Sequence, residues 1–331
     1  MVIEETEMQE TERERLGRLS TEASAVSDSL KGEMAKALVG MDVLSDLLLT
    51  CMLAEGHAVL EGVPGVAKTT LIKRFSESLG LHFSRIQFTP DLLPADILGN
   101  YVYNPADGSF SLRKGPIFAN IVLADEINRS PPKTQSALLE CMQERQATIE
   151  GTTLPMQLPF MVMATENPVE LEGTYPLPEA QIDRFLFKLE VGYPGEEAEL
   201  LMLEMKNVSM DPEPPGLVMG QDDLSRMIRG CKEVHVERPV LQYIRDLVLA
   251  TRQDENVQLG ASPRASEHYL RAVKARALVS GRPYATTDDV KELARPLLLH
   301  RLMLTVDAEL EEITPSSVIE NVVRRVPVPR E

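Results

Sequence analysis

The chain has 331 residues, of which 43% are apolar and 26% are charged, a composition typical of a soluble globular protein. Its formal net charge of -17 argues against a nucleic-acid-binding protein, because such proteins normally present a basic surface. No segment approaches the roughly 18 consecutive apolar residues that span a bilayer, and the charged N-terminus and three scattered cysteines predict a cytoplasmic protein with reduced thiols and no signal peptide.

The first part of the chain is expected to be partly helical. Residues 1–28 are charged and poor in large apolar side chains, and we expect them to form a frayed or partly helical extension. A helical pattern of apolar residues then runs from about residue 29 to residue 54 and stops at Gly56.

Five strand-length apolar segments follow, at residues 58–62, 83–89, 120–127, 160–168 and 185–191. Helical stretches separate several of them. This alternation is typical of a parallel sheet with helices on both faces, so we predict an α/β fold built on a parallel five-stranded sheet.

The pattern changes after Tyr193 and Pro194. A helical stretch and a proline-rich connector lead into several amphipathic helices between residue 222 and about residue 304. We therefore divide the chain into three parts. Residues 1–28 form a charged N-terminal extension, residues 29–194 an α/β domain and residues 195–331 an all-α domain.

The segment after the first predicted strand, GVPGVAKTT, resembles a phosphate-binding P-loop. The usual pattern is G-x-x-x-x-G-K-[ST], and Ala67 stands where the second glycine is expected. We expect the alanine to be tolerated because its backbone would already be helical. Lys68 would reach the β- and γ-phosphates, and the Thr69 hydroxyl would bind Mg²⁺. Backbone N–H groups of the loop and the helix start would surround the phosphates, so the predicted nucleotide ligands are Gly62, Pro64, Gly65, Val66, Ala67, Lys68, Thr69 and Thr70.

Two carboxylates follow the apolar segment 121–124, at the end of a predicted strand. Ligands bind at the carboxyl ends of strands in open α/β sheets. Asp125 would hold the Mg²⁺ shell through water, and Glu126 would face the nucleophilic water. Phosphoryl transfer requires a positioned water and neutralised charge, so the pair predicts ATP hydrolysis with Mg²⁺.

Together these motifs make the chain similar to the AAA+ ATPases, and among them to the MoxR family, over residues 32 to 304. The stretches that carry the resemblance are LEGVPGVAKT, DEINRSPPKTQSALLECMQE, EGTYPLPEAQIDRFLF and GASPRA. The resemblance implies a P-loop NTPase core followed by a small all-α lid domain, with ATP and Mg²⁺ as cofactors. It also implies a homo-oligomeric ring, most simply a hexamer. The family's own loop tolerates alanine before the lysine, which favours a working site.

The resemblance assigns three further residues. Asn167 matches the first sensor, an amide that orients the attacking water, and Arg184 matches the arginine finger that a neighbouring subunit supplies in trans. Arg264 matches the second sensor, at the start of a lid helix, from which it could contact the γ-phosphate. The alternatives are an ion pair of Arg184 with Glu179 or Asp183 and a solvated Arg264.

Several weaker features accompany these motifs. Glu166 departs from the family, which often has glutamine there, and adds negative charge near the phosphates. Arg129 is a weaker candidate for a second contact between subunits. Segments 100–116 and 146–159 alternate around turns and predict two hairpins. They resemble the helix-2 insert and the pre-sensor hairpin of this clade, which commonly face the ring's channel or a client, although plain surface hairpins remain the alternative.

The leading hypothesis is a ring-forming, Mg²⁺-dependent ATPase that acts as a chaperone or remodeller of client proteins. The resemblance also implies a partner that carries a von Willebrand factor A (VWA) domain, which must be another polypeptide. Three alternatives stay open: a nucleic-acid motor, the motor subunit of a metal chelatase, and an ATP-dependent scaffold with little turnover. The acidic charge and the lack of a basic, aromatic-interleaved stretch disfavour the first of these.

Overall fold

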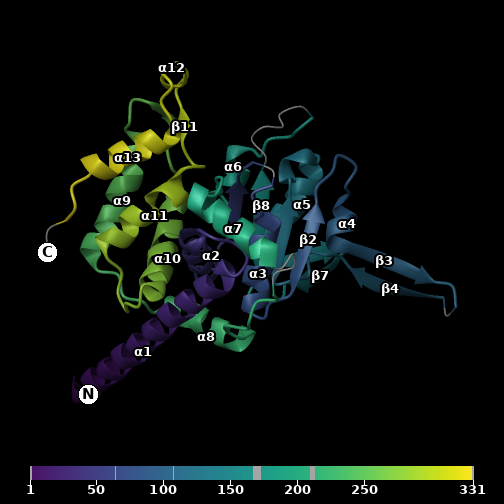
Figure 1. The fold of residues 1–331 in the computed structure, drawn as a ribbon, viewed down its shortest axis with the longest axis horizontal. Helices are drawn as coiled ribbons and strands as arrows, with labels where there is room; N and C mark the ends of the chain where they lie inside the picture. Colours follow the sequence, from purple (N-terminus) through teal and green to yellow (C-terminus); the bar gives the residue numbers. More distant parts are fainter. Residues whose placement is uncertain (1, 64, 107, 167–172, 209–212, 330–331) are drawn as a thin grey trace.

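The computed structural model describes residues 2–63, 65–106, 108–166, 173–208 and 213–329 (Figure 1). At its centre lies a five-stranded sheet in the order β2-β5-β8-β1-β9. Every neighbouring pair in this sheet is parallel. The predicted parallel sheet is therefore confirmed, with the strands β1 (Ala58–Glu61), β2 (Phe83–Gln87), β5 (Ile121–Asp125), β8 (Met161–Glu166) and β9 (Phe187–Glu190).

The sheet separates two hydrophobic cores, because successive side chains of a strand point to opposite faces. Leu60 and Leu123 belong to the core that contains α2 (Asp42–Leu53), α3 (Lys68–Ser78) and the C-terminal helices. Val59 and Val122 belong to the core that contains α4 (Pro94–Leu98) and α5 (Pro132–Glu144). Burial on both faces explains why these strands are apolar throughout rather than alternating.

Among the described residues after residue 194, the regular elements are helices apart from one short antiparallel ribbon of two strands. The expected all-α lid therefore carries a small β element that the sequence analysis did not predict. The division of domains near residue 194 stays a proposal. The elements are α7 (Glu196–Val208), α8 (Gln221–Cys231), α9 (Arg238–Arg252), β10 (Val257–Leu259), α10 (Pro263–Val279), α11 (Thr287–Leu298), β11 (Met303–Leu304), α12 (Val306–Leu310) and α13 (Pro315–Arg325).

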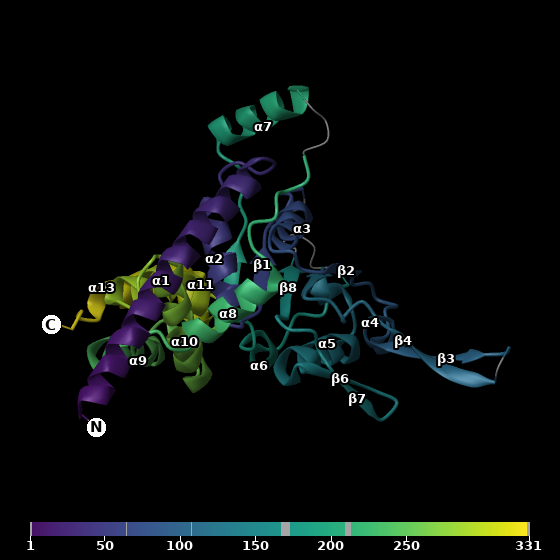
Figure 2. The same ribbon diagram turned by 90° about the horizontal axis from the view of Figure 1, so that it is seen from below.

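The N-terminal segment is more regular than the expected frayed or partly helical extension. One helix, α1 (Val2–Ala35), continues unbroken through residue 28, and it runs along α8 and α10 (Figure 2). Its exposed Glu22 pairs with Arg226 of α8 at 2.5 Å. Along α1, a sparse stripe of apolar residues at helical spacing packs into the core. The stripe consists of Leu19, Ala23, Leu30 and Met34.

Both predicted hairpins are present. One consists of β3 (Gly99–Asn104) and β4 (Ser109–Lys114), and the other of β6 (Gln146–Ile149) and β7 (Thr152–Pro155). The β3–β4 hairpin extends away from the rest of the molecule in both views (Figures 1 and 2). In the part of the chain that the structure describes, no helix is both long and apolar enough to cross a bilayer.

His57 connects three elements at the start of β1. Its Nδ1 accepts a hydrogen bond from the backbone N–H of Val162 in β8 at 2.9 Å, and its Nε2 donates to the carbonyl oxygen of Met142 in α5 at 3.1 Å. Only the neutral ring can accept at one nitrogen and donate at the other. Burial lowers the pKa of His57 from 6.5 to about 4.

This histidine predicts acid sensitivity of the fold. Because the folded pKa lies below the unfolded one, the neutral ring contributes stability above pH 6.5, and that contribution is lost as the pH falls toward 4. The shift corresponds to about 3 kcal/mol. The measurement is urea titration followed by circular dichroism, repeated at several pH values between 7 and 4. As the pH falls, the free energy of unfolding should decrease more steeply in the parent than in His57→Gln, whose amide also offers an acceptor and a donor. The exposed His82→Gln is the control, and equal slopes in parent and His57→Gln would contradict this account.

Candidate functional site

The predicted P-loop connects β1 to α3 at the carboxyl edge of the sheet. A side chain at Gly62 would place its Cβ 2.4 Å from the carbonyl oxygen of Val191, so the loop can leave β1 only through glycine. Gly65 has a φ of +87°, and a Cβ there would meet no atom within 4 Å. The loop thus presents its backbone without side-chain obstruction at this turn, as a phosphate cradle requires. Pro64 lies outside the described residues.

Lys68 opens α3 and lies over the loop. Its Nζ donates a hydrogen bond to the carbonyl oxygen of Gly62 at 2.5 Å. Burial lowers the pKa of Lys68, although the carboxylates of Asp125, Glu126 and Glu61 oppose this shift. The ammonium therefore faces the loop on one side and three carboxylates on the other. Thr69 and Thr70 follow in the first turn of the same helix, while Val66 is buried beneath the loop.

The backbone of Ala67 is not helical, contrary to the expectation from the sequence. Its φ of 58° and ψ of 27° lie in the left-handed region. An alanine there costs about 1 kcal/mol or more relative to its preferred conformations, because Cβ crowds the following carbonyl oxygen. This explains why the usual pattern has glycine at the position, and it shows that alanine is accommodated under strain.

Asp125 ends β5 and is held by two neighbouring strands. Its Oδ1 accepts a hydrogen bond from the Thr165 hydroxyl of β8 at 2.6 Å, and its Oδ2 accepts from the Arg85 guanidinium of β2 at 2.6 Å. Sequence reasoning did not single out Thr165 or Arg85. The available signal was the strand alignment, since Ala124 lies opposite Ala164 and Thr165 therefore follows beside Asp125.

Glu126 turns sharply after Asp125, with a φ of 58°. Its backbone N–H donates to the Thr165 hydroxyl at 2.8 Å. Its Oε2 accepts from the Gln87 amide at 2.8 Å and from Arg129 at 3.0 Å. Arg129, the weaker candidate for a contact between subunits, is therefore paired with the candidate catalytic carboxylate of its own chain.

Glu166 lies beside Glu61, its partner in the parallel register of β8 and β1. Burial raises the pKa of Glu166, and Lys188 lowers it less than burial and Glu61 together raise it. Lys188 is already paired with Glu61 at 3.0 Å. A neutral carboxyl presents one donor and one acceptor, as a glutamine amide does, so the departure from the family pattern is small while Glu166 keeps its proton. Asn167, the predicted first sensor, lies outside the described residues.

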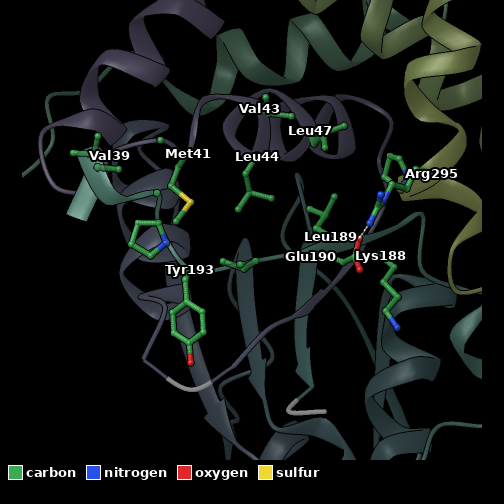
Figure 3. A pocket seen from close by; sticks show the side chains of 17 residues that line it. Val39, Met41, Val43, Leu44, Leu47, Lys188, Leu189, Glu190, Tyr193 and Arg295 are labelled. Atoms are coloured by element: carbon green, nitrogen blue, oxygen red, sulfur yellow. Dashed lines mark hydrogen bonds and ion pairs between the residues drawn. The ribbon is translucent and has the colours of Figure 1, made fainter. Parts of the chain in front are cut away.

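A cavity of about 340 Å³ adjoins the P-loop (Figure 3). It lies between residues 39–47 and residues 188–195, and Val191 connects it to the loop by donating its N–H to the carbonyl oxygen of Glu61 at 2.8 Å. Met41 and Leu44 point into this space (Figure 3). Sequence reasoning did not find this cavity, and its only local signal is the glycine that precedes α2.

Arg184 lies at the opposite edge of the sheet from the P-loop. Because β9 is parallel to β1, with Phe187 opposite Ala58, residues before Phe187 lie at the amino ends of the strands. Arg184 donates through Nη1 to the carbonyl oxygen of Leu139 at 3.1 Å. Within the described residues it forms no ion pair with Glu179 or Asp183, and its Nε is buried without a partner. The alternative of a structural ion pair is therefore not realised in this structure.

Arg264 begins the helix α10 and lies with Arg184. Its Nη1 is 3.7 Å from Oδ2 of Asp183, and both arginines line a cavity of about 1040 Å³. Of the P-loop residues that the structure describes, 62–63 and 65–70, none lines that cavity. The structure thus brings Arg264 together with Arg184 rather than with Lys68. The contact of Arg264 with a γ-phosphate stays a prediction.

Comparison with known proteins identifies the family. A model described as "ATPase family associated with various cellular activities (AAA)" matches residues 57–187, and an "AAA lid domain" matches residues 249–322. The chain is 46% identical over 307 residues to Chaperone MoxR1 of Mycobacterium tuberculosis, with 90% of this chain and 81% of the relative covered. It is 30% identical over 327 residues to Protein MoxR of Methylorubrum extorquens, with 90% and 93% covered. The chain belongs to the MoxR family of AAA+ ATPases.

A solved structure agrees with this membership. A crystal structure of a Cytophaga hutchinsonii protein, 39% identical in sequence, matches with a TM-score of 0.87 and covers 98% of this chain and 99% of its own. The uncharacterized protein YeaC of Bacillus subtilis is 46% identical over 294 residues, with 89% and 92% covered. The MoxR-type AAA+ fold with its lid therefore spans nearly the whole chain.

The strain at Ala67 predicts that Ala67→Gly stabilises this MoxR protein. Glycine relieves the left-handed strain but loses more entropy on folding, so we expect a net gain on the order of 0.5–1 kcal/mol in the free energy of unfolding. The measurement is urea denaturation followed by circular dichroism. Ala58→Gly, in the buried strand β1, is the matched control and should destabilise the protein. An equal loss of stability in both variants would show that Ala67 carries no such strain.

The raised pKa of Glu166 predicts a pH-dependent effect on nucleotide affinity. As the pH rises through the folded pKa, Glu166 loses its proton and repels the phosphates. Glu166→Gln should therefore bind a fluorescent ATP analogue as the parent does at a pH below the folded pKa of Glu166, and several-fold more tightly at a pH above it. The exposed Glu179→Gln serves as the control. A ratio of affinities that stays constant with pH would contradict a titrating Glu166.

Proposed function

We propose that this MoxR-type protein is a Mg²⁺-dependent ATPase whose active site is completed between the subunits of a homo-oligomeric ring. The observation that carries the proposal is the division of the candidate residues between two edges of one sheet. Lys68 and Asp125 lie at the carboxyl edge, whereas Arg184 and Arg264 lie at the amino edge. A second copy of the chain is needed to bring the two sets together.

At the carboxyl edge, the loop residues would hold the phosphates of ATP. Lys68 neutralises the β- and γ-phosphates, and the Thr69 hydroxyl with Asp125 holds Mg²⁺. Such a site suits Mg²⁺, which usually binds through one or two protein groups, phosphates and waters. When bound, the ion neutralises charge that develops on the phosphates. The cavity beside residues 39–47 has the position and the apolar lining for the adenine base.

Glu126 would orient and deprotonate the attacking water. Both of its side-chain hydrogen bonds use Oε2, which leaves Oε1 without a protein partner in the part of the chain that the structure describes. Gln87 and Arg129 fix the direction of the carboxylate, so Oε1 is presented to a water near the γ-phosphate. Asn167 would hold the same water from the end of β8, as the family resemblance implies.

Arg184, and Arg264 beside it, would reach the γ-phosphate of the neighbouring subunit. A guanidinium supplied in trans stabilises the charge of phosphoryl transfer and contributes roughly 10³–10⁵ in rate. A ring of six subunits gives every site such a neighbour. Because the complete site needs two chains, turnover depends on assembly.

We further propose that ATP hydrolysis drives the remodelling of client proteins in the cytoplasm, with a VWA-domain protein as partner. The name of the relative Chaperone MoxR1 supports the chaperone part. The projecting β3–β4 hairpin offers a contact surface, since Tyr103 and Phe110 are exposed there with ring centroids 5.2 Å apart. The three buried, free cysteines suit a reducing compartment.

The test is steady-state ATP hydrolysis as a function of protein concentration, with Glu126→Gln and Arg184→Ala measured beside the parent. Specific activity should rise with concentration as subunits assemble. Both variants should lose at least about 100-fold in rate while they still bind ATP. The exposed Arg238→Ala on α9 controls for loss of a positive charge, and single-stranded DNA should not change the rate.

Two outcomes would contradict the proposal. A parent rate that is negligible at every concentration would leave a scaffold without turnover. Full activity of Arg184→Ala would show that no arginine finger acts at this position.

A further inference from the structure

Arg301 joins the lid to the segment that carries Arg184. It lies just after α11, with a side chain that is 1% exposed. Its guanidinium donates to Oδ1 of Asp183 at 2.8 Å, to the carbonyl oxygen of Phe185 at 2.5 Å and to that of Leu186 at 3.2 Å. In the part of the chain that the structure describes, Arg301 also bonds Leu297 and His268 of the lid, and its other acceptors all belong to residues 183–186.

Two lid histidines complete this contact. Nδ1 of His268 in α10 lies 2.6 Å from Nη2 of Arg301, and it must accept because a guanidinium only donates. Burial, and then the charge of Arg301, lower the pKa of His268 well below 6.5, in keeping with a neutral ring. His300 donates through Nε2 to the carbonyl oxygen of Phe185 at 3.1 Å. Asp183 offsets part of the burial effect on Arg301, whose pKa of about 10 keeps it charged.

The carboxylate of Asp183 contacts two arginines of the lid, Arg301 and Arg264. Its Oδ1 accepts from Arg301, while its Oδ2 accepts from the Ser262 hydroxyl at 2.9 Å and lies 3.7 Å from Arg264. The next residue in the chain is Arg184. The backbone on both sides of Arg184 is thus fixed to the lid of its own chain, through the ion pair of Arg301 with Asp183 and the hydrogen bonds to the carbonyl oxygens of Phe185 and Leu186.

The helix that leads to Arg301 also reaches the nucleotide side of the molecule. Arg295 of α11 lines the cavity beside the P-loop and pairs with Glu190, at the carboxyl end of β9, at 2.6 Å. Arg301 holds Asp183, which precedes the amino end of the same strand. The helix α11 and the turn after it therefore contact β9 near both of its ends. Arg295 makes the contact beside the cavity, and Arg301 makes the contact beside Arg184.

We propose that Arg301 is a positioning residue that couples the lid of one chain to the arginine finger it offers to the next. The inference rests on the proposed trans role of Arg184. A change in lid position, as nucleotide fills or leaves the cavity beside Arg295, moves residues 183–186 and with them Arg184. Catalysis in the neighbouring subunit then depends on the lid of the chain that supplies the finger.

The test is complementation in mixed rings. Arg301→Lys keeps the charge but lacks the planar fork that bonds several acceptors at once. Alone, it should bind ATP as the parent does and hydrolyse it at least about tenfold more slowly. Mixed in equal amounts with Glu126→Gln, it should recover up to about a quarter of the parent's activity, because about one subunit pair in four joins an intact site to an intact finger.

Three matched mixtures make the result decisive. Arg184→Ala with Glu126→Gln should recover activity in the same way, which tests the trans finger itself. Lys68→Ala mixed with Glu126→Gln should recover no activity. Each of these variants has a defective nucleotide site, so no subunit in the mixed ring supplies an intact one. Asp183→Asn, which keeps the size of the side chain, should behave like Arg301→Lys and serves where the latter does not fold.

The outcomes separate the two proposals. If the Arg184→Ala mixture recovers activity while the Arg301→Lys and Asp183→Asn mixtures do not, Arg301 acts only within its own chain and the coupling is overturned. If no mixture recovers activity, the trans finger fails, and the coupling fails with it. The coupling is supported if the mixtures of Arg184→Ala, Arg301→Lys and Asp183→Asn with Glu126→Gln all recover ATP hydrolysis while the Lys68→Ala mixture recovers none.

Discussion

The parallel alignment of the five strands is the constraint on which the rest of the structure depends. Because β1, β5 and β8 all point the same way, Lys68, Asp125 and Glu126 meet at one edge without any contribution from the lid. The same alignment puts Arg184 at the other edge. A strand of four residues separates the two edges by about 13 Å, so Arg184 lies away from the P-loop of its own chain.

Among the described residues of the candidate site, two that are not glycine have left-handed backbone, and they have it for different reasons. Ala67 and Glu126 both have a φ of 58°. The methyl group of Ala67 has no role in the proposed site, so a glycine could replace it and remove the strain. At Glu126 the turn directs a carboxylate toward Gln87 and Arg129, and glycine would remove the acid itself. The proposed role of Glu126 would therefore account for the strain at this residue, since strained backbone is common at active sites.

The sequence predicted those parts of the structure that depend on neighbours along the chain. Short apolar segments that end in polar residues defined the strands, and the loop before Lys68 was recognisable because its spacing is local. Thr165 was missed because its partner Asp125 is 40 residues away and only the strand register brings them together. The apolar stripe of α1 and the cavity beside residues 39–47 were missed for the same reason, since each acquires its meaning from packing against distant helices.

A buried arginine makes the link between lid and finger stiff. Separating a buried charge from its partners leaves it unsolvated, which typically costs about 3–5 kcal/mol. As the lid moves, the buried Arg301 therefore cannot replace its protein acceptors by water one at a time. Residues 183–186 must move with Arg301, or all of these hydrogen bonds must break together. Packed interfaces of this kind switch between discrete arrangements rather than deforming continuously. A surface ion pair such as Arg295–Glu190, which is half exposed on both sides, tolerates sliding. The lid can thus adjust at the nucleotide cavity while it transmits its position at the finger.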